Sequence, residues 1–100
     1  APPARQVMAV RYHIPSYLHA FTGGQSVVQI EASPGTVGEA LALLGVLYPG
    51  VRDRVTTEGG EVRPHVNVFV GSENIRHTGG LGTPIAEGDD IFILPAVSGG

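Results

Sequence analysis

The chain ends in two glycines, and the terminal carboxylate of Gly100 is the group best placed to do chemistry. Glycine has no Cβ, so Gly99 and Gly100 could pass through a narrow channel and adopt dihedrals that other residues avoid. The unbranched end also leaves the last carbonyl carbon open to in-line attack. Diglycine alone is a weak motif, since 15 of the 100 residues are glycine. The sequence suggests a carboxylate that enters the active site of another protein.

The other side chains that could carry chemistry do not form a recognised site. No two of the four histidines have the i, i+4 spacing of a zinc motif: His13, His19, His65 and His77. The glycine-rich stretch 79–82 lacks the Lys and Ser/Thr that follow in a phosphate-binding loop. The acidic stretch 87–90 lacks the spacing of an EF-hand. We therefore predict no catalytic residue and no metal site in this chain.

Composition excludes several classes of function. The absence of cysteine excludes disulfides, thiolate metal sites and cysteine nucleophiles. A net charge of −3, with six scattered arginines as the only basic residues, gives no electrostatic footprint for nucleic acid. No apolar run is long enough to span a membrane, and residues 1–6 resemble a flexible leader more than a signal peptide. We therefore expect no nucleic acid or membrane partner and a cytoplasmic location.

The sequence predicts one main helix in the domain that carries the terminus. Thr36 is a suitable N-cap, and Glu39 three residues later completes a capping box. Apolar residues then recur at helical spacing and predict one stripe that faces the core: Val37, Ala40, Leu41, Leu44, Leu47 and Tyr48. The Pro49-Gly50 pair is expected to end this helix, and a short helical turn is expected over 51–55.

Alternating or β-forming runs predict the strands: 7–13, 26–31, 66–70, a short one at 75–77, and 91–94. Loops or turns are expected where glycine, proline or acidic residues cluster: 16–25, 71–74, 79–84 and 87–90. The helix lies between two hairpin-like halves. This order predicts an α+β fold in which one main helix packs across a mixed sheet of about four or five strands. The domain would span 7–95, followed by a flexible tail over 96–100.

The last third of the chain carries a pattern of short motifs: Arg63 to Val70, Asn74-Ile75-Arg76, Gly80-Leu81, Ile85 to Ile91, and Leu94 to Gly100. With this pattern the chain resembles the MoaD/ThiS family of sulfur carriers, which are ubiquitin-like β-grasp proteins. Thr22-Gly23-Gly24 fits one branch, the CysO-type carriers of cysteine biosynthesis. The resemblance implies the strand order 2-1-5-3-4, with the last strand central and parallel to the first.

The resemblance also implies a two-step chemistry at Gly100. An E1-like adenylyltransferase of the MoeB/ThiF type uses ATP to form an acyl-adenylate, and sulfur then displaces AMP to leave a thiocarboxylate. In the CysO-type pathway this group attacks an activated serine derivative on a pyridoxal-phosphate-dependent cysteine synthase, and a metalloprotease releases cysteine. The chain would be a co-substrate without a bound cofactor, not an enzyme. Three tail residues would give the carboxylate its reach: Val97, Ser98 and Gly99.

A docking surface follows from the alternation of the strands. If the valines of 66–70 and the isoleucines of 91–94 face the helix, the residues between them face outward. Phe69, Phe92 and Leu94 would then form an exposed apolar patch beside the root of the tail. We expect this patch to dock the adenylyltransferase.

Four alternative functions remain open at this point. The small subunit of molybdopterin synthase and the thiamine-type sulfur carriers belong to the same family. A ubiquitin-like modifier would be joined through Gly100 to lysines of other proteins, and this lysine-free chain could not extend such conjugates through its side chains. A β-grasp interaction module with an inert tail is the fourth possibility.

Overall fold

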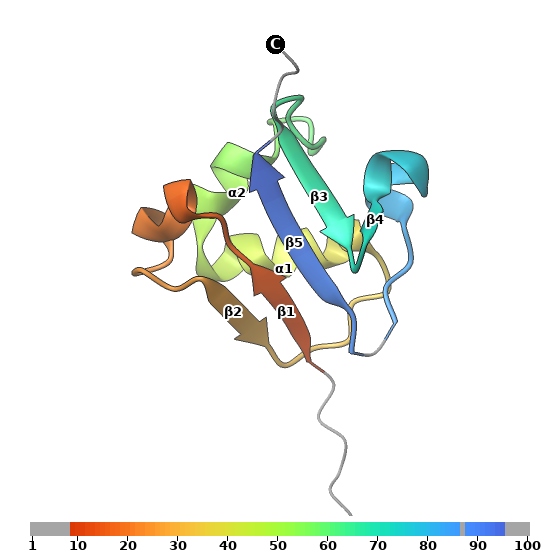
Figure 1. The fold of residues 1–100 in the computed structure, drawn as a ribbon, viewed down its shortest axis with the longest axis horizontal. Helices are drawn as coiled ribbons and strands as arrows, with labels where there is room; N and C mark the ends of the chain where they lie inside the picture. Colours follow the sequence, from red (N-terminus) through yellow and green to blue (C-terminus); the bar gives the residue numbers. More distant parts are fainter. Residues whose placement is uncertain (1–8, 87, 96–100) are drawn as a thin grey trace, which may run out of the picture.

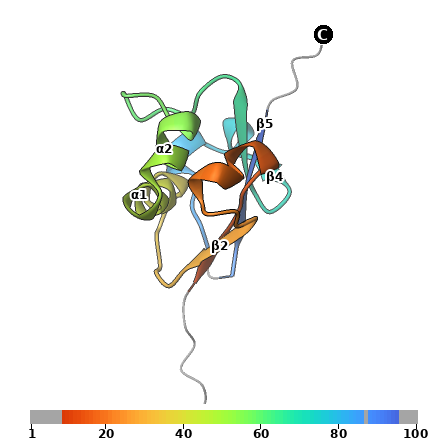
Figure 2. The ribbon, with the colours of Figure 1, turned by 90° about the vertical axis from the view of Figure 1, so that its left-hand side faces the viewer.

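A sheet and a layer of helices form the two sides of the molecule (Figure 1). The computed structural model describes residues 9–86 and 88–95. The strands are β1 (Val10–His13), β2 (Val27–Ile30), β3 (Val66–Val70), β4 (Glu73–Asn74) and β5 (Asp90–Pro95). The α-helices are α1 (Val37–Leu47) and α2 (Pro49–Val55), and short 3-10 helices span Ser16–Phe21, Ile75–His77 and Gly80–Gly82. Both α-helices lie on the same side of the sheet, as Figure 2 shows, which confirms the α+β prediction.

The sheet has the strand order β2-β1-β5-β3-β4, as the resemblance implied. β5 is the central strand and pairs in parallel with β1 and antiparallel with β3. The chain therefore leaves the middle of the sheet at Pro95, the last residue described. This β-grasp arrangement places β5 between two neighbouring strands, and its last residue, Pro95, pairs with Val66 of β3.

The capping box at the start of α1 is confirmed in part. The backbone N–H of Glu39 donates to the Thr36 hydroxyl at 3.2 Å. The Glu39 carboxylate accepts from the backbone N–H of Gly35 at 2.9 Å, one residue before the predicted partner. The helix thus begins where the sequence predicted, because its first N–H groups find side-chain acceptors.

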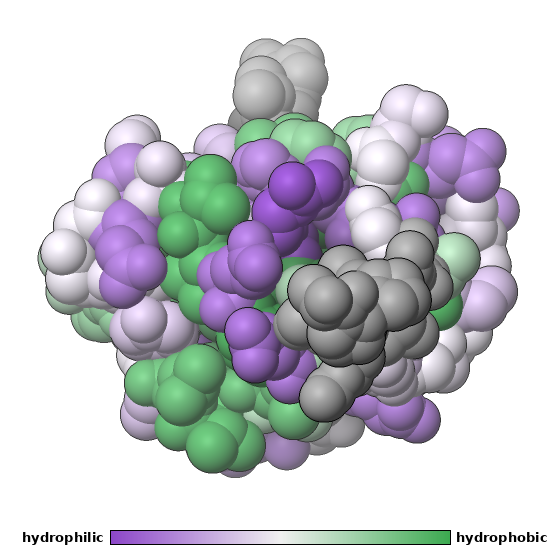
Figure 3. Space-filling model, turned by 90° about the horizontal axis from the view of Figure 1, so that it is seen from below, coloured by the Kyte–Doolittle hydropathy of each residue, from purple (hydrophilic) through white to green (hydrophobic). Residues whose placement is uncertain are grey.

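The core-facing stripe of α1 is shorter than predicted. Val37, Ala40, Leu41 and Leu44 are buried, but Leu47 is 57% exposed and Tyr48 is only partly buried. The prediction for Leu47 was wrong because α2 follows α1 at once and places Val51 and Val55 in the core instead. Apolar surface consequently reaches solvent on the helix side of the molecule, at the lower left of Figure 3.

The chain turns sharply between the two helices, and Gly45 allows them to pack closely. Tyr48 separates the helices, and Pro49 begins α2 two residues before the predicted helical turn. A Cβ atom on Gly45 would lie 2.5 Å from Cδ of Arg52 and 3.0 Å from its Cβ. Proline suits the first turn of a helix because its missing N–H would lack a partner there in any case.

Three further predictions of local structure need correction. The fourth strand is β4 at Glu73–Asn74, which was predicted as part of a turn, while Ile75–His77 forms a 3-10 helix. Ser16–Phe21, predicted as loop, is also a 3-10 helix. β1 begins at Val10, later than predicted, and the first two residues of the predicted strand lie outside the described part of the chain.

Tyr12 anchors α1 to the sheet. Its side chain is fully buried, and its hydroxyl donates a hydrogen bond to the Ala40 carbonyl. Burial raises the pKa of Tyr12 above its ordinary value of 10.0, because the charged phenolate would lose its hydration.

We expect Tyr12→Phe to lower the free energy of unfolding by about 1–2 kcal/mol at pH 7, since the buried hydrogen bond from the hydroxyl to the Ala40 carbonyl is lost. Above pH 10 the unfolded chain loses the Tyr12 proton while the folded chain keeps it. The wild type should then lose about 1.4 kcal/mol more stability per pH unit than the variant. Urea unfolding of both proteins from pH 7 to 11 measures this. Parallel curves at alkaline pH would contradict the expectation, because the two proteins share every ionisable group except the Tyr12 hydroxyl.

Candidate functional site

The predicted reactive terminus can be located only by its root. Gly100 and the predicted tail residues Val97, Ser98 and Gly99 lie outside the described residues. The described chain ends at Pro95, which pairs with Val66 at the start of β3. The root of the terminus is therefore held at one end of the sheet by the β3–β5 ladder.

The three residues of the predicted docking patch lie together on the outer face of the sheet. Ile91 and Ile93 are buried against the helices, so the alternate residues of β5 point the other way. Phe92 is directly opposite Phe69 in the β3–β5 register, and both are partly buried. Leu94, one step closer to the root of the terminus, is 42% exposed. The predicted faces of both strands are thus confirmed, and the docking role stays a prediction.

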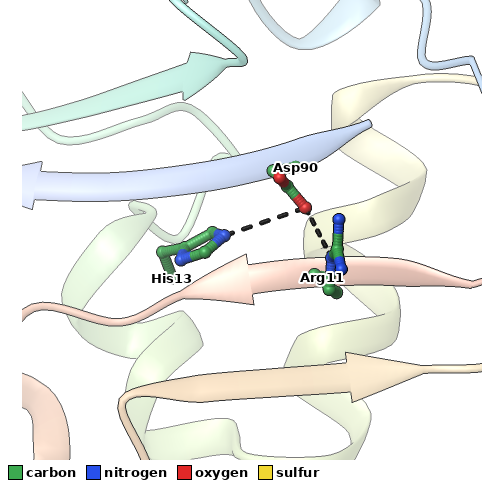
Figure 4. A network of polar contacts seen from close by, with 3 residues as sticks. All are labelled: Arg11, His13 and Asp90. Carbon is green, nitrogen blue, oxygen red and sulfur yellow. Dashed lines mark hydrogen bonds and ion pairs between the residues drawn. The ribbon is translucent and has the colours of Figure 1, made fainter. Parts of the chain in front are cut away.

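A polar cluster that the sequence analysis missed lies beside this patch (Figure 4). The His13 imidazole stacks on the Phe92 ring, with centroids 4.1 Å apart and planes inclined by 11°. Nε of Arg11 donates to Oδ1 of Asp90 at 2.7 Å, and Nε2 of His13 lies 3.8 Å from the same oxygen. The parallel pairing of β1 with β5 brings these residues together. Alternation within 7–13 could have placed Arg11 and His13 on one face, but not beside β5.

Arg76 ties the start of β3 to the 3-10 helix that follows β4. Its Nη2 donates to the Val66 carbonyl at 2.7 Å and lies 3.2 Å from the Arg63 carbonyl, while its Nε donates to Oδ1 of Asn67 at 3.3 Å. The same Asn67 oxygen accepts from Nδ2 of Asn74 at 3.4 Å. These residues belong to the motif pattern in the last third of the chain. In the fold they form one network next to the root of the terminus.

We expect Arg76→Ala to lower the free energy of unfolding by about 1–3 kcal/mol, because several charge-assisted hydrogen bonds to carbonyls disappear. Arg76→Lys should recover only part of this loss, since an ammonium cannot reproduce the planar fork of donors. Chemical denaturation measures both changes. A value for Arg76→Ala within error of the wild type would show that the network adds no net stability.

Other kinds of site find no support within the described residues. No three His, Asp or Glu side chains among residues 9–86 and 88–95 lie close enough to hold a metal ion. None of the helices in this part of the chain is long and apolar enough to cross a membrane. A cleft of about 400 Å³ opens on the helix side of β3, where Val68 and Ile75 line it, and not on the face that carries Phe69 and Phe92.

Comparison with known proteins finds relatives that the chain matches over most or all of their length. The sequence profile of the ThiS family matches residues 13–100. The chain is 40% identical over 95 residues to the sulfur carrier protein CysO of Mycobacterium tuberculosis, which covers 93% of this chain and 100% of that protein. The crystal structure of Mycobacterium tuberculosis CysO matches with a TM-score of 0.78 at 39% identity, covering 88% of this chain and 99% of that one.

Two further relatives show the breadth of the similarity. The crystal structure of the Amycolatopsis orientalis BexX/CysO complex contains a chain that matches with a TM-score of 0.78 at 35% identity, covering 91% of this chain and 99% of that one. Small archaeal modifier protein 3 of Haloferax volcanii is 36% identical over 78 residues, or 78% of this chain and 84% of that protein. The profile match over residues 13–100, with this identity to curated members, shows that the chain belongs to the ThiS family.

Proposed function

We propose that this protein is a sulfur carrier that delivers sulfur from a thiocarboxylate at Gly100, with cysteine biosynthesis as the preferred pathway. The observation that carries the proposal is the 40% identity to the CysO sulfur carrier over that protein's whole length. The family match also extends through Gly99 and Gly100. The β-grasp fold supports the same proposal, because it anchors the root of the terminus in the centre of the sheet.

The chemistry that we propose needs partners to supply the reactive groups. A carboxylate is a poor electrophile, so an E1-like adenylyltransferase first transfers AMP from ATP to the Gly100 carboxylate. A sulfur nucleophile then attacks the acyl carbon, AMP leaves, and a thiocarboxylate remains. This chain supplies the acyl group and its reach, and it acts as a co-substrate. It has no lysine side chain that could capture the activated carbonyl within the same molecule.

We propose two further partners for the loaded carrier. A pyridoxal-phosphate-dependent cysteine synthase would present the activated serine derivative that the thiocarboxylate attacks. A metalloprotease would then release the product and restore the free diglycine end. The BexX/CysO complex shows that a related carrier binds another protein, which supports a role in protein complexes for this chain.

A protein modifier is the second candidate, because one relative with 36% identity is a small archaeal modifier protein. In that role Gly100 would be joined to lysines of other proteins. Blotting of whole-cell lysate separates the two functions. A ladder of larger species supports the modifier, whereas a single band at the mass of the free chain supports the carrier.

Intact-mass measurement tests the proposed function directly. The protein is incubated with ATP, a sulfur source and a candidate E1-like adenylyltransferase. The expected product is heavier by about 16 Da, because one oxygen of the carboxylate is exchanged for sulfur. Omission of ATP should prevent the gain. The same mass with every candidate activating enzyme would contradict the proposal.

A further inference from the structure

His13 lies on the outer face of the sheet, at the end of β1. The strand registers place it opposite Val27 of β2 on one side and opposite Phe92 of β5 on the other. Phe92 is in turn opposite Phe69 of β3. Asn74 of β4 lies opposite Phe69, so one row of five residues crosses the sheet. The imidazole of His13 stacks on the Phe92 ring with centroids 4.1 Å apart. His13 thus supports one side of the ring at the centre of the predicted docking patch.

The ring of His13 carries a polar atom without a partner. Its Nε2 is buried and makes no hydrogen bond to any of the described residues. The nearest carboxylate oxygen, Oδ1 of Asp90, is 3.8 Å away and already accepts from Nε of Arg11 at 2.7 Å. Strands β2 and β3 place only the uncharged Val27 and Phe69 in the row. With a neutral imidazole the cluster therefore holds one positive and one negative charge.

Protonation of His13 would disturb this arrangement in two ways. The cluster would gain a net positive charge, which a partner surface would have to desolvate when it covers the row. The imidazolium would also be drawn toward Asp90, in competition with Arg11 and away from its stacked position on Phe92. Both effects make the apolar row less suitable for an apolar partner surface.

We infer that His13 is a positioning residue of the docking surface, whose neutral imidazole holds Phe92 for the activating enzyme and whose protonation weakens docking. The inference rests on the proposed function, which requires an E1-like enzyme, and on the prediction that this enzyme docks on the patch of Phe69, Phe92 and Leu94. It adds that the surface binds the enzyme most tightly when the His13 imidazole is neutral.

Calorimetric binding of the full chain to an E1-like adenylyltransferase, from pH 5.5 to 8.0, tests the inference. The wild-type Kd is expected to rise with acidification by about three- to tenfold more than the Kd of His13→Phe, which keeps an aromatic ring but cannot be protonated. The ratio of the two values cancels the titration of the enzyme itself. His77→Phe is the matched control, because His77 is exposed on the 3-10 helix after β4, and it should follow the wild type.

NMR of the wild-type chain gives a second measurement. The ring resonances of His13 and Phe92 should move with the same midpoint as the wild-type Kd, and a different midpoint for the two rings would contradict the inference. A constant ratio of the wild-type and His13→Phe Kd values would overturn the inference. If His13→Phe does not fold, His13→Gln replaces it. Absence of binding at every pH would overturn docking itself and this inference with it, while a mass gain of about 16 Da would still support the carrier function.

Discussion

Deletion of Gly99 and Gly100 is expected to abolish formation of the thiocarboxylate, with no detectable mass gain under conditions that convert the wild type. The shorter chain still ends in a carboxylate, but its reach is up to about 7 Å shorter than that of the wild type, because two extended residues span this distance. Misplacement of a reacting group by about 1 Å can cost roughly 100-fold in rate. Intact-mass spectrometry over time measures the loss as a ratio of rates.

Two controls separate a loss of reach from a loss of folding. The deletion removes no residue of the described sheet or core, so the truncated protein should unfold at the same temperature as the wild type. Gly100→Ala keeps a carboxylate at the same position and should react more slowly without losing all activity, because a Cβ now crowds the carbonyl. If the truncated chain still supports growth where the wild type is required, both the carrier and the modifier proposals fail.

Leu94→Asp is expected to raise the KM of the adenylyltransferase for this carrier by about 100-fold with little change in kcat. The side chain is 42% exposed and lies between the Phe69–Phe92 pair and the root of the terminus. A carboxylate there would have to be desolvated under the partner, and central interface positions typically cost about 2–4 kcal/mol when disrupted. Steady-state kinetics of adenylate formation measures the change, and Phe69→Asp should act in the same direction.

Val46→Asp is the matched control for this experiment. Val46 is 77% exposed on α1, on the opposite side of the sheet from the docking patch, and receives the same chemical change. We expect its KM to remain within about twofold of the wild type, since a surface substitution outside an interface has little effect. Normal turnover by correctly folded Leu94→Asp and Phe69→Asp proteins would show that the outer face does not dock the enzyme. An equal rise with Val46→Asp would point to a general effect of added negative charge.

Local patterns in the sequence predicted the elements whose residues alternate or recur most regularly. The period of two in 66–70 and 91–94 placed Val66, Val68, Ile91 and Ile93 inside, because successive side chains of a strand must point to opposite faces. Thr36 marked the start of α1 because a helix leaves its first N–H groups without partners. The order of the strands came from the family resemblance and not from these patterns.

Patterns failed where packing against another element decided the outcome. Leu47 fits the apolar period of α1, but the sharp turn into α2 leaves it exposed and fills the core with Val51 and Val55. The dipeptide Glu73–Asn74 is too short to show any period, and it became β4 because it can pair with Phe69 and Val70 across a tight turn. A segment of two residues takes its structure from the strand that it pairs with, because the β propensity of so few residues contributes little free energy.

The sequence by itself determined the outward direction of Phe69, Phe92 and Leu94, because this direction depends on spacing within one strand, and its diglycine end pointed to the terminal carboxylate as the reactive group. Only the tertiary structure decided what lies beside them. The parallel pairing of β1 with β5 brings His13 onto Phe92 from the other end of the chain. Contacts between segments so far apart depend on strand register and helix packing, and no local pattern records either of them.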